Sequence, residues 1–409
     1  MKVLYISYDG MTDPLGQSQV IPYLKGLVKL GHEIALISAE KSEKKNERTR
    51  VWKIMSDAGI DWFPIEYTKK PPVISTIRDI RKIMLLSEKL FHEKKIEAIH
   101  CRSYVAAIVG LWMKKNFGVK FIFDMRGFWA DERVEGAIWN LKNPVYRTVY
   151  NYFKRKEKLF LENADAIVSL TENAKQEILT WKKIKNQPLS LEVIPCCVDM
   201  NLFDSKKISD SEIQKKKSEF GLSDAKFVLS YCGSIGTWYL CDEMLEFFSC
   251  IQKKIPSAKF LFITPEEREF VLNKARAKNI SDESIVLLKA SRNEMPLLLK
   301  CSDASVFFIK QSFSKKASSP VKQGEIMSMG IPIICNSGVG DTDLIVNDSN
   351  AGFVIDTMNE KSFNQIADRI VKGELNNFSA EKIRSGAEKF YSLEKGIEKY
   401  FSVYQKLSK

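Results

Sequence analysis

The segment from Ser314 to Asp341 combines residue types that suit an anionic, hydroxylated ligand. It reads SKKASSPVKQGEIMSMGIPIICNSGVGD and holds Lys315, Lys316 and Lys322 beside small residues. Lysine side chains and helix N-terminal amides bind the oxygens of a diphosphate. A single carboxylate, Glu325, suits two vicinal hydroxyls such as those of a ribose. The segment therefore predicts a nucleoside diphosphate site, with a solvated basic loop and a surface acid as the alternative.

A glycine-containing turn lies earlier, in YCGSIGTWY, between a predicted strand and a helix expected near Asp242. Gly233 and Gly236 let backbone N–H groups approach a phosphate because neither carries a Cβ atom. A plain strand-to-helix turn is the alternative. Further along, Pro320 suits the first turn of the helix that carries Lys322. The residues predicted to bind this ligand are Gly233, Ser234, Gly236, Lys310, Lys315, Lys316, Ser319, Pro320, Val321, Lys322 and Glu325.

Polar residues also follow two predicted strands in the first half of the chain. The stretches HCRSYVAA and FDMRGFWADERVEGAIW place Arg102, Asp124, Arg126, Asp131 and Glu132 after apolar runs. Ligands of open α/β sheets bind outside the carboxyl ends of the strands. We therefore expect these side chains to face a cleft, and an Asp124–Arg126 pair that only shapes a loop is the alternative.

Short apolar runs alternate with helical periodicity along the chain, which is typical of parallel sheets flanked by helices. The series begins with KVLYIS as a strand and SQVIPYLKGLVKLGH as a single helix, and it restarts after about Asn201 with KFVLSYCGS. At 409 residues the chain is longer than one core usually organises. The pattern predicts an α/β fold of two Rossmann-like domains, residues 1–195 and 196–385, that face each other across a cleft.

Composition narrows the classes of function. The net charge of +12 is made up of +9 over residues 1–200 and +3 over residues 201–409, so the first half is expected to lean toward an anionic partner. The start, MKVLYISYDG, lacks the pattern of a secretory signal and no run of 18 apolar residues follows, which predicts a soluble, cytoplasmic protein. The eight cysteines are interpreted as reduced core residues, and EKSEKKNERTR as a charged loop.

Taken in order, these stretches resemble the retaining glycosyltransferases of family 4, which have the GT-B architecture of two Rossmann-like domains. The strongest likeness lies in SPVKQGEIMSMGIPII followed by GVGD. The resemblance implies that the turn at Gly233 lies against the pyrophosphate of a nucleotide-sugar donor. It implies further that Lys322 lies near this pyrophosphate and that Glu325 binds the nucleotide ribose.

The resemblance also assigns parts of the first half. DPLGQSQVIPYL is similar to the family's first strand-to-helix loop, with Gly16 near donor and acceptor, and residues 386–409 are similar to a C-terminal helix that returns to the first domain. Arg126 and Asp124 stand near the position of a family histidine at the end of a strand. The catalytic residues predicted on this basis are Lys322, Glu325 and Arg126. The residues predicted to line the acceptor side are Gly16, Gln17, Arg102, Asp124 and Arg126.

Two departures from the family pattern are visible. The family's E-x7-E would place an acid at position 317, where this chain has Ala317, and that acid usually contacts the donor sugar. The family also tends to have Arg and Lys after the glycine-rich turn, whereas GTWYLCDEM has neither. We expect Lys310, Lys315 or Lys316 to supply the phosphate charge instead.

The resemblance implies a retaining hexosyltransferase that takes a nucleotide-sugar donor and a saccharide or lipid-linked acceptor, in bacterial surface polysaccharide synthesis. No metal or other cofactor is expected. The stretch NPVYRTVYNYFKRKEKLFLE predicts a helix with an apolar face of Val145, Val149, Tyr152 and Phe160 beside basic residues, which suits an anionic membrane surface on the cytoplasmic side. A packed helix with one wet face is the alternative.

Three other functions remain open from the sequence. A nucleotide-sugar 2-epimerase has the same two-domain fold but needs catalytic acids and a histidine in the cleft. An inactive relative that binds a nucleotide sugar without transferring it is consistent with Ala317. Binding of nucleic acid is suggested only by the positive charge, and no recognition motif accompanies it, so no nucleic-acid partner is expected.

Overall fold

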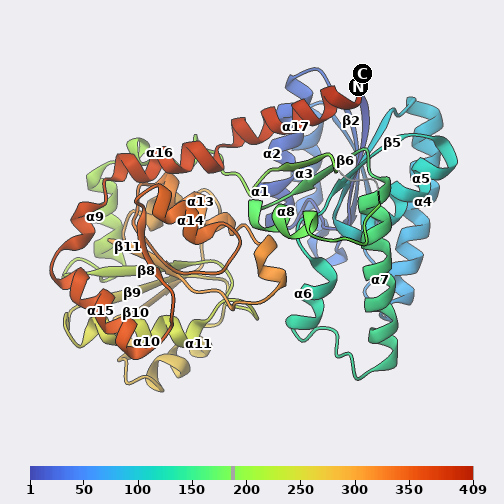
Figure 1. The fold of residues 1–409 in the computed structure, drawn as a ribbon. Coiled ribbons are helices and arrows are strands. Elements are labelled where there is room, and N and C mark those ends of the chain that lie inside the picture. The colour runs from blue at the N-terminus through green and yellow to red at the C-terminus, as the bar shows by residue number, and fades with distance from the viewer. Residues whose placement is uncertain (186–188, 409) are drawn as a thin grey trace. The chain divides into compact units, whose positions relative to one another are not determined.

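The computed structural model describes residues 1–185 and 189–408. The chain divides into two compact units, coloured mainly blue to green and yellow to red in Figure 1. Unit 1 comprises Met1–Pro195, Lys316–Ser318 and Leu393–Lys409, and unit 2 comprises Cys196–Lys315 and Ser319–Ser392. Each unit is built on its own parallel sheet, as the alternation of apolar runs and helical periodicity predicts.

The sheet of unit 1 has the strand order β3-β2-β1-β4-β5-β6-β7, and its strands pair in parallel. The central strands are buried along almost their whole length because helices cover both faces. The strands are β1 (Lys2–Ser7), β2 (Glu33–Glu40), β3 (Ile60–Glu66), β4 (Ala98–Arg102), β5 (Lys120–Asp124), β6 (Ala166–Ser169) and β7 (Leu191–Val193).

Helices cover the two faces of this sheet. The helices of unit 1 are α1 (Pro14–Gln19), α2 (Ile21–Lys29), α3 (Lys45–Asp57), α4 (Ile74–Lys94), α5 (Ser103–Phe117), α6 (Trp129–Glu135), α7 (Pro144–Asn163), α8 (Glu172–Leu179) and α17 (Leu393–Leu407). Helices α4, α5 and α7 lie on one face, whereas α2, α3 and α17 lie on the other (Figure 1). Leu4 and Ile6 of β1 pack in the apolar cluster that includes α5, as the two-residue period of a strand requires.

Two tyrosines of α17 complete a buried polar cluster in unit 1. The Tyr400 hydroxyl donates to Asp124 Oδ2 at 2.9 Å, and the Tyr404 hydroxyl lies 2.7 Å from His100 Nδ1. All four side chains are buried. Burial lowers the pKa of His100, so the imidazole is neutral and can share a proton with a hydroxyl.

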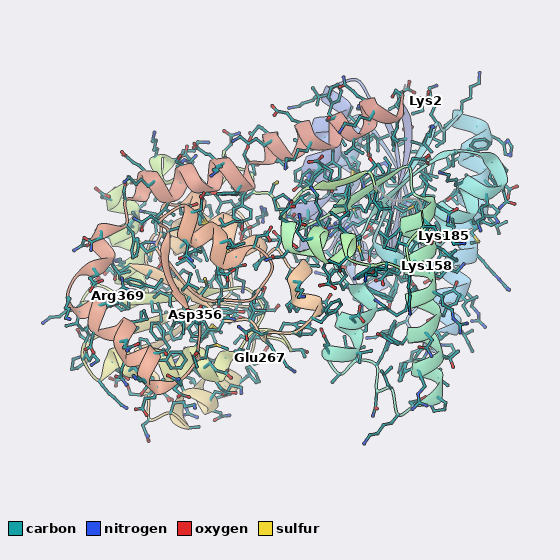
Figure 2. All side chains as sticks on the ribbon, viewed as in Figure 1. Lys2, Lys158, Lys185, Glu267, Asp356 and Arg369 are labelled. Carbon is teal, nitrogen blue, oxygen red and sulfur yellow. The ribbon has the colours of Figure 1, made fainter. Side chains whose placement is uncertain are left out.

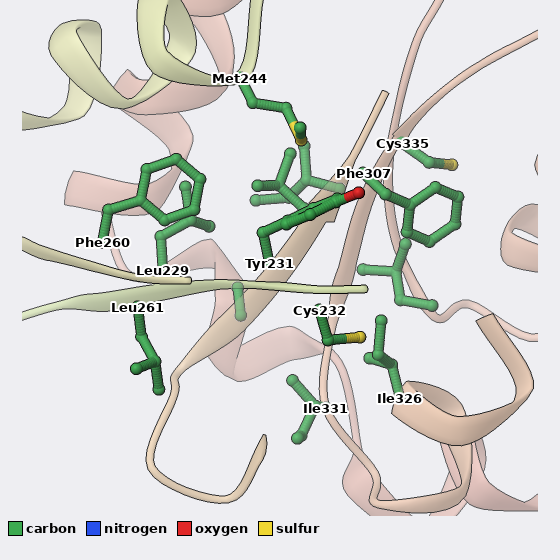
Figure 3. Close-up of a cluster of buried hydrophobic side chains, with 14 of the residues drawn as sticks. Leu229, Tyr231, Cys232, Met244, Phe260, Leu261, Phe307, Ile326, Ile331 and Cys335 are labelled. Atoms are coloured by element: carbon green, nitrogen blue, oxygen red, sulfur yellow. The ribbon is translucent and has the colours of Figure 1, made fainter. Parts of the chain in front are cut away.

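The sheet of unit 2 has the order β10-β9-β8-β11-β12-β13. Its strands are β8 (Val228–Cys232), β9 (Lys259–Ile263), β10 (Ile285–Leu288), β11 (Ala304–Phe307), β12 (Ile333–Asn336) and β13 (Gly352–Ile355). Its helices are α9 (Asp210–Glu219), α10 (Cys241–Gln252), α11 (Arg268–Arg276), α12 (Met295–Leu299), α13 (Val321–Ser328), α14 (Thr342–Asp348), α15 (Glu360–Val371) and α16 (Ala380–Tyr391). Figure 3 shows Tyr231 and Cys232 on opposite sides of β8, each packed in apolar core.

Two local predictions from the sequence are wrong. The single helix expected over SQVIPYLKGLVKLGH is two helices, α1 and α2, because Val20 departs from helical geometry just before Pro22. The run EKSEKKNERTR is largely helical, since its second half begins α3. That helix buries Val51 and Met55, which follow the charged run. Charged side chains, Glu267 and Arg369 among them, project from the surface of the units (Figure 2).

Replacing Tyr404 by Phe should lower the free energy of unfolding by about 1–2 kcal/mol, because the buried His100 Nδ1 loses its partner. Urea denaturation of the full chain followed by circular dichroism measures this. Tyr152→Phe is the matched control, since the Tyr152 side chain is 43% exposed, and it should change the free energy by less than about 0.5 kcal/mol. Equal effects of the two substitutions would contradict a stabilising bond at Tyr404.

Candidate functional site

The strand order of unit 2 has a switch point between β8 and β11. Strand β8 pairs with β9 on one side and β11 on the other, so the crossover connections diverge at this point. Ligands of open parallel sheets bind at such a point, outside the carboxyl ends of the strands. Gly233 directly follows β8, and the segment that leads to α13 follows β11. The glycine turn and the lysine-rich segment predicted from the sequence therefore meet at one sheet edge.

The glycine turn packs directly against Lys322. Gly233 has a φ of 108°, and a Cβ atom added there would lie 3.1 Å from the Lys322 ammonium nitrogen. A side chain at position 233 would thus both strain the backbone and displace the ammonium group. The Tyr231 hydroxyl donates to the Ser234 carbonyl at 2.6 Å, which fixes the turn on its strand. Gly236, with a φ of 34°, has open space around its Cα atom.

Lys322 is a buried cation held against aromatic rings. Only 7% of the residue is exposed. Its ammonium nitrogen lies 4.1 Å from the ring centre of Tyr231 and 3.5 Å from that of Tyr239, close enough for cation–π attraction. Among the described residues this nitrogen has no hydrogen-bond partner. Burial lowers the pKa of Lys322 to about 7. An anion at this position would supply the missing acceptor and favour the protonated form.

Glu325 lies one turn after Lys322 on α13, so the two side chains share a helix face. Its Oε1 atom lies 2.7 Å from Arg292 Nη1. Burial raises the pKa of Glu325, and the Arg292 guanidinium opposes that shift. Arg292 was missed by the sequence reasoning. It follows β10, so a systematic inspection of charged residues after every strand would have found it.

The other predicted lysines are arranged differently. The Lys315 ammonium nitrogen lies 3.7 Å from the ring centre of Trp238, and the Lys310 side chain is exposed while its backbone N–H donates to the Trp238 carbonyl. Lys316 belongs to unit 1, where its ammonium group pairs with Glu177 at 2.8 Å. The structure therefore groups Lys310 and Lys315 with unit 2, and Lys316 with unit 1.

The residues that open α13 have structural contacts of their own. Ser319 Oγ accepts a hydrogen bond from the Cys196 N–H at 3.1 Å, and Pro320 occupies the N-cap position before Val321. Neither contact involves Lys322. Binding roles for these three residues, as for the other predicted ligand contacts, stay predictions.

Unit 1 has its own switch point, between β1 and β4, where its strand order diverges. Arg102 ends β4 and stands opposite Ser7 of β1 and Asp124 of β5 in the sheet register. Arg126 follows β5 with a φ of 57°, which few non-glycine residues adopt, and its Nη1 lies 3.8 Å from Asp124 Oδ1. The predicted trio of Arg102, Asp124 and Arg126 is thus assembled at one sheet edge.

The loop after β1 is held by Glu40. The Glu40 carboxylate accepts hydrogen bonds from the Met11 N–H at 2.6 Å and from both the N–H and the hydroxyl of Thr12, at 3.1 and 2.6 Å. A Cβ atom on Gly16 would lie 2.3 Å from the Gly10 carbonyl oxygen, so only glycine fits there. Glu40 was missed by the sequence reasoning, although a buried acid at the end of an apolar strand is a usable signal.

Three more positions of unit 1 can be placed. Gln17 donates to the Thr12 carbonyl and accepts from Arg50. Asp131 accepts from Tyr150 and from Lys154, each at 2.8 Å, which ties α6 to α7. Ala317 is 3% exposed and packs in the apolar cluster of unit 1, where a carboxylate would be buried.

Two protein families match the chain. Residues 18–202 match the family described as Glycosyltransferase Family 4, and residues 212–390 match the family described as Glycosyl transferases group 1. Together the two matches span most of the sequence. No curated protein matches the chain in sequence.

Solved structures resemble the chain over its whole length. A glycosyltransferase from Rickettsia africae ESF-5 has 16% identity and a TM-score of 0.74, covering 100% of this chain and 98% of its own. HepE from Anabaena in complex with UDP-glucose has 12% identity and a TM-score of 0.71, covering 99% and 100%. A protein from Listeria monocytogenes described as a UDP-N-acetylglucosamine 2-epimerase has 12% identity and a TM-score of 0.61, covering 99% and 95%. At these identities the likeness concerns the fold.

The free energy of unfolding should depend on pH through Lys322. The folded pKa is about 7 and the ordinary value is 10.5, so between these the unfolded chain binds more protons and stability rises with pH. The rise is at most about 1.4 kcal/mol per pH unit. Lys322→Met should be more stable than wild type at about pH 6, and the difference should shrink toward about pH 9. Urea denaturation of both proteins across this range tests it, and a constant difference would contradict an easily deprotonated Lys322.

Proposed function

Because this chain belongs to the family 4 and group 1 glycosyltransferases and has their GT-B fold, we propose that it is a retaining enzyme that moves a hexose from a nucleotide sugar to a saccharide or lipid-linked acceptor. Unit 2 would bind the donor and unit 1 the acceptor. Synthesis of a bacterial surface polysaccharide is the process that this reaction fits.

The observation that carries the proposal is the buried Lys322 ammonium group. It faces the Gly233 turn at the switch point of unit 2, and it lacks a hydrogen-bond partner among the described residues. A donor diphosphate supplies negative oxygens that a buried cation binds strongly. Glu325, one helical turn away, would accept hydrogen bonds from the ribose hydroxyls. HepE of Anabaena, which has a similar fold, was solved with UDP-glucose, which supports a nucleotide-sugar donor.

Arg292 gives the ribose subsite a further property. Its contact with Oε1 favours the ionised form of Glu325, against the effect of burial. An ionised carboxylate accepts two hydrogen bonds without donating one, which suits a vicinal diol. Arg292 would therefore act as a positioning residue for nucleotide binding.

The proposed chemistry needs charge stabilisation more than proton transfer by side chains. As the bond from the anomeric carbon to the diphosphate breaks, negative charge accumulates on the leaving phosphate. Lys322 and the amides of the Gly233 turn would stabilise that charge. The acceptor hydroxyl would attack from the same face, and its proton would pass to a phosphate oxygen. No metal takes part in this scheme.

Helix α7 supports an additional proposal, contact with an anionic membrane surface. None of the described helices combines the length and the apolar character that a bilayer crossing requires. Val145 and Tyr152 are 56% and 43% exposed, and Arg147 and Arg155 are exposed beside them. Phe160, expected on the same face, is instead fully buried in the core. The docking surface would therefore be the part of α7 from Pro144 to Arg155.

The binding experiment is a calorimetric titration with UDP, GDP and pyrophosphate. Lys322→Met should weaken the binding of a nucleoside diphosphate and of pyrophosphate alike, by roughly tenfold to a hundredfold, because both ligands present the same phosphates. Glu325→Gln should weaken the binding of the nucleotide but not that of pyrophosphate, because pyrophosphate has no ribose. Binding should not change when a metal chelator is added. Lys389→Met, whose side chain is 60% exposed on α16, is the control.

Each outcome has a meaning. Binding that survives in Lys322→Met would contradict the donor site. Binding without turnover of any UDP- or GDP-hexose would favour an inactive relative. Conversion of a UDP-hexose to its C2 epimer without an acceptor would favour the epimerase, whose fold is represented by the Listeria protein.

The membrane proposal predicts binding to vesicles that contain phosphatidylglycerol but not to vesicles of phosphatidylcholine alone. Replacing Arg147 and Arg155 together by Gln should weaken binding by roughly 2 kcal/mol, about 1 per charge. Lys206 and Lys372 of unit 2 are also exposed, and their double replacement by Gln is the charge-matched control. Cosedimentation with vesicles measures both, and an equal loss in the two double variants would refute a specific role for α7.

A further inference from the structure

Arg102 carries a buried guanidinium group in which two nitrogen atoms lack a hydrogen-bond partner within the described chain. The residue is 5% exposed. Its Nε and Nη1 atoms are buried and have no hydrogen-bond partner among residues 1–185 and 189–408. A guanidinium group has five N–H donors and stays charged at any physiological pH. Burying such a group costs free energy unless acceptors are supplied. A ligand with negative oxygens would supply them.

The carboxylates near Arg102 do not meet this need. Asp9 Oδ2 lies 3.4 Å from Nε without hydrogen-bond geometry, and the Asp9 side chain is 51% exposed to solvent, which weakens its attraction. Asp124 already accepts from Tyr400 and pairs with Arg126. Burial opposes ionisation of Asp124, but Arg126 and His100 bring its pKa below the ordinary value. The negative charge of Asp124 is therefore committed to other partners.

The backbone around Arg102 favours an anion as well. Arg102 is the N-cap residue of α5, and within the described chain no side chain caps this 15-residue helix. Its first N–H groups carry partial positive charge. Ser103 has a φ of 67°, and Arg126, after the neighbouring strand, has a φ of 57°. Left-handed backbone at two adjacent strand ends is costly and recurs at binding sites.

We propose that Arg102 and the first amides of α5 form an oxyanion subsite, which binds a phosphate or carboxylate group of the acceptor. The inference rests on the proposed function, in which unit 1 binds the acceptor. It adds that the acceptor is an acidic sugar or a phosphate-bearing lipid or sugar, and not a neutral saccharide. Asp9 would act as an exchangeable partner that turns to solvent when the ligand arrives.

The first experiment is a calorimetric titration with inorganic phosphate, glucuronate and glucose. Arg102→Gln should weaken the binding of phosphate or glucuronate by about tenfold or more, since charge-assisted hydrogen bonds are lost. Lys322→Met should retain the anion that Arg102 binds, and so should Arg147→Gln, an exposed arginine of α7 with the same change of charge. Glucose should not bind in the absence of an anion. Preference for phosphate or for glucuronate distinguishes a phosphate-bearing from a carboxylate-bearing acceptor.

The same variants separate this inference from the proposed function. UDP binding should be intact in Arg102→Gln and weakened in Lys322→Met. If Arg102→Gln lowers the affinity for UDP as much as Lys322→Met does, Arg102 belongs to the donor site and the inference is wrong. The absence of any Arg102-dependent anion binding also overturns it, whatever the result with UDP.

A second variant decides the matter if Arg102→Gln does not fold. Asp9→Asn removes the competing carboxylate from a half-exposed position, so it should tighten anion binding by about threefold or more. Asp13→Asn, on the same loop but paired with Lys41, is the control and should leave anion affinity unchanged. Unchanged affinity in Asp9→Asn would overturn the inference.

Discussion

A buried ammonium group without a hydrogen-bond acceptor is unfavourable, and the Lys322 ammonium group has none among the described residues of unit 2. Tyr231 and Tyr239 place their ring faces against Lys322, and Gly233 leaves the space that a Cβ atom would occupy. Helix α13 then fixes Glu325 one turn away. A cation held in this way by rigid neighbours is what the proposed donor site requires, because a preorganised charge need not rearrange when an anion binds.

The same logic appears in unit 1 with different residues. Arg102 and Arg126 follow neighbouring strands, with Asp9 3.4 Å from the first and Asp124 3.8 Å from the second. Residues that follow parallel strands must lie near one another, because the carboxyl ends of all these strands lie at one edge of the sheet. The strand order then sets the position of the switch point along that edge. Each unit thus concentrates cations at the point where its strand order diverges.

The sequence predicted the parts of the structure that depend on local pattern. The two α/β arrays, the start of α13 after Pro320 and the glycine turn after β8 follow from periodicity and turn chemistry. The contacts of Glu40 and Arg292 were not predictable in the same way, because each joins segments far apart in the chain. The charged run EKSEKKNERTR was predicted to be a loop although its second half begins α3, since the apolar residues that anchor this helix come after the charges.

Helix α17 has a consequence for how the protein is made. Pro195 ends the main part of unit 1, yet Tyr400 and Tyr404, which satisfy buried Asp124 and His100, come after the whole of unit 2 in the chain. A ribosome therefore releases the first seven strands long before the residues that complete their polar core. Domains commonly fold one after another during synthesis. Unit 1 emerges first but is completed last, because its final helix follows unit 2 in the chain. Unit 2 can therefore fold before α17 has been synthesised.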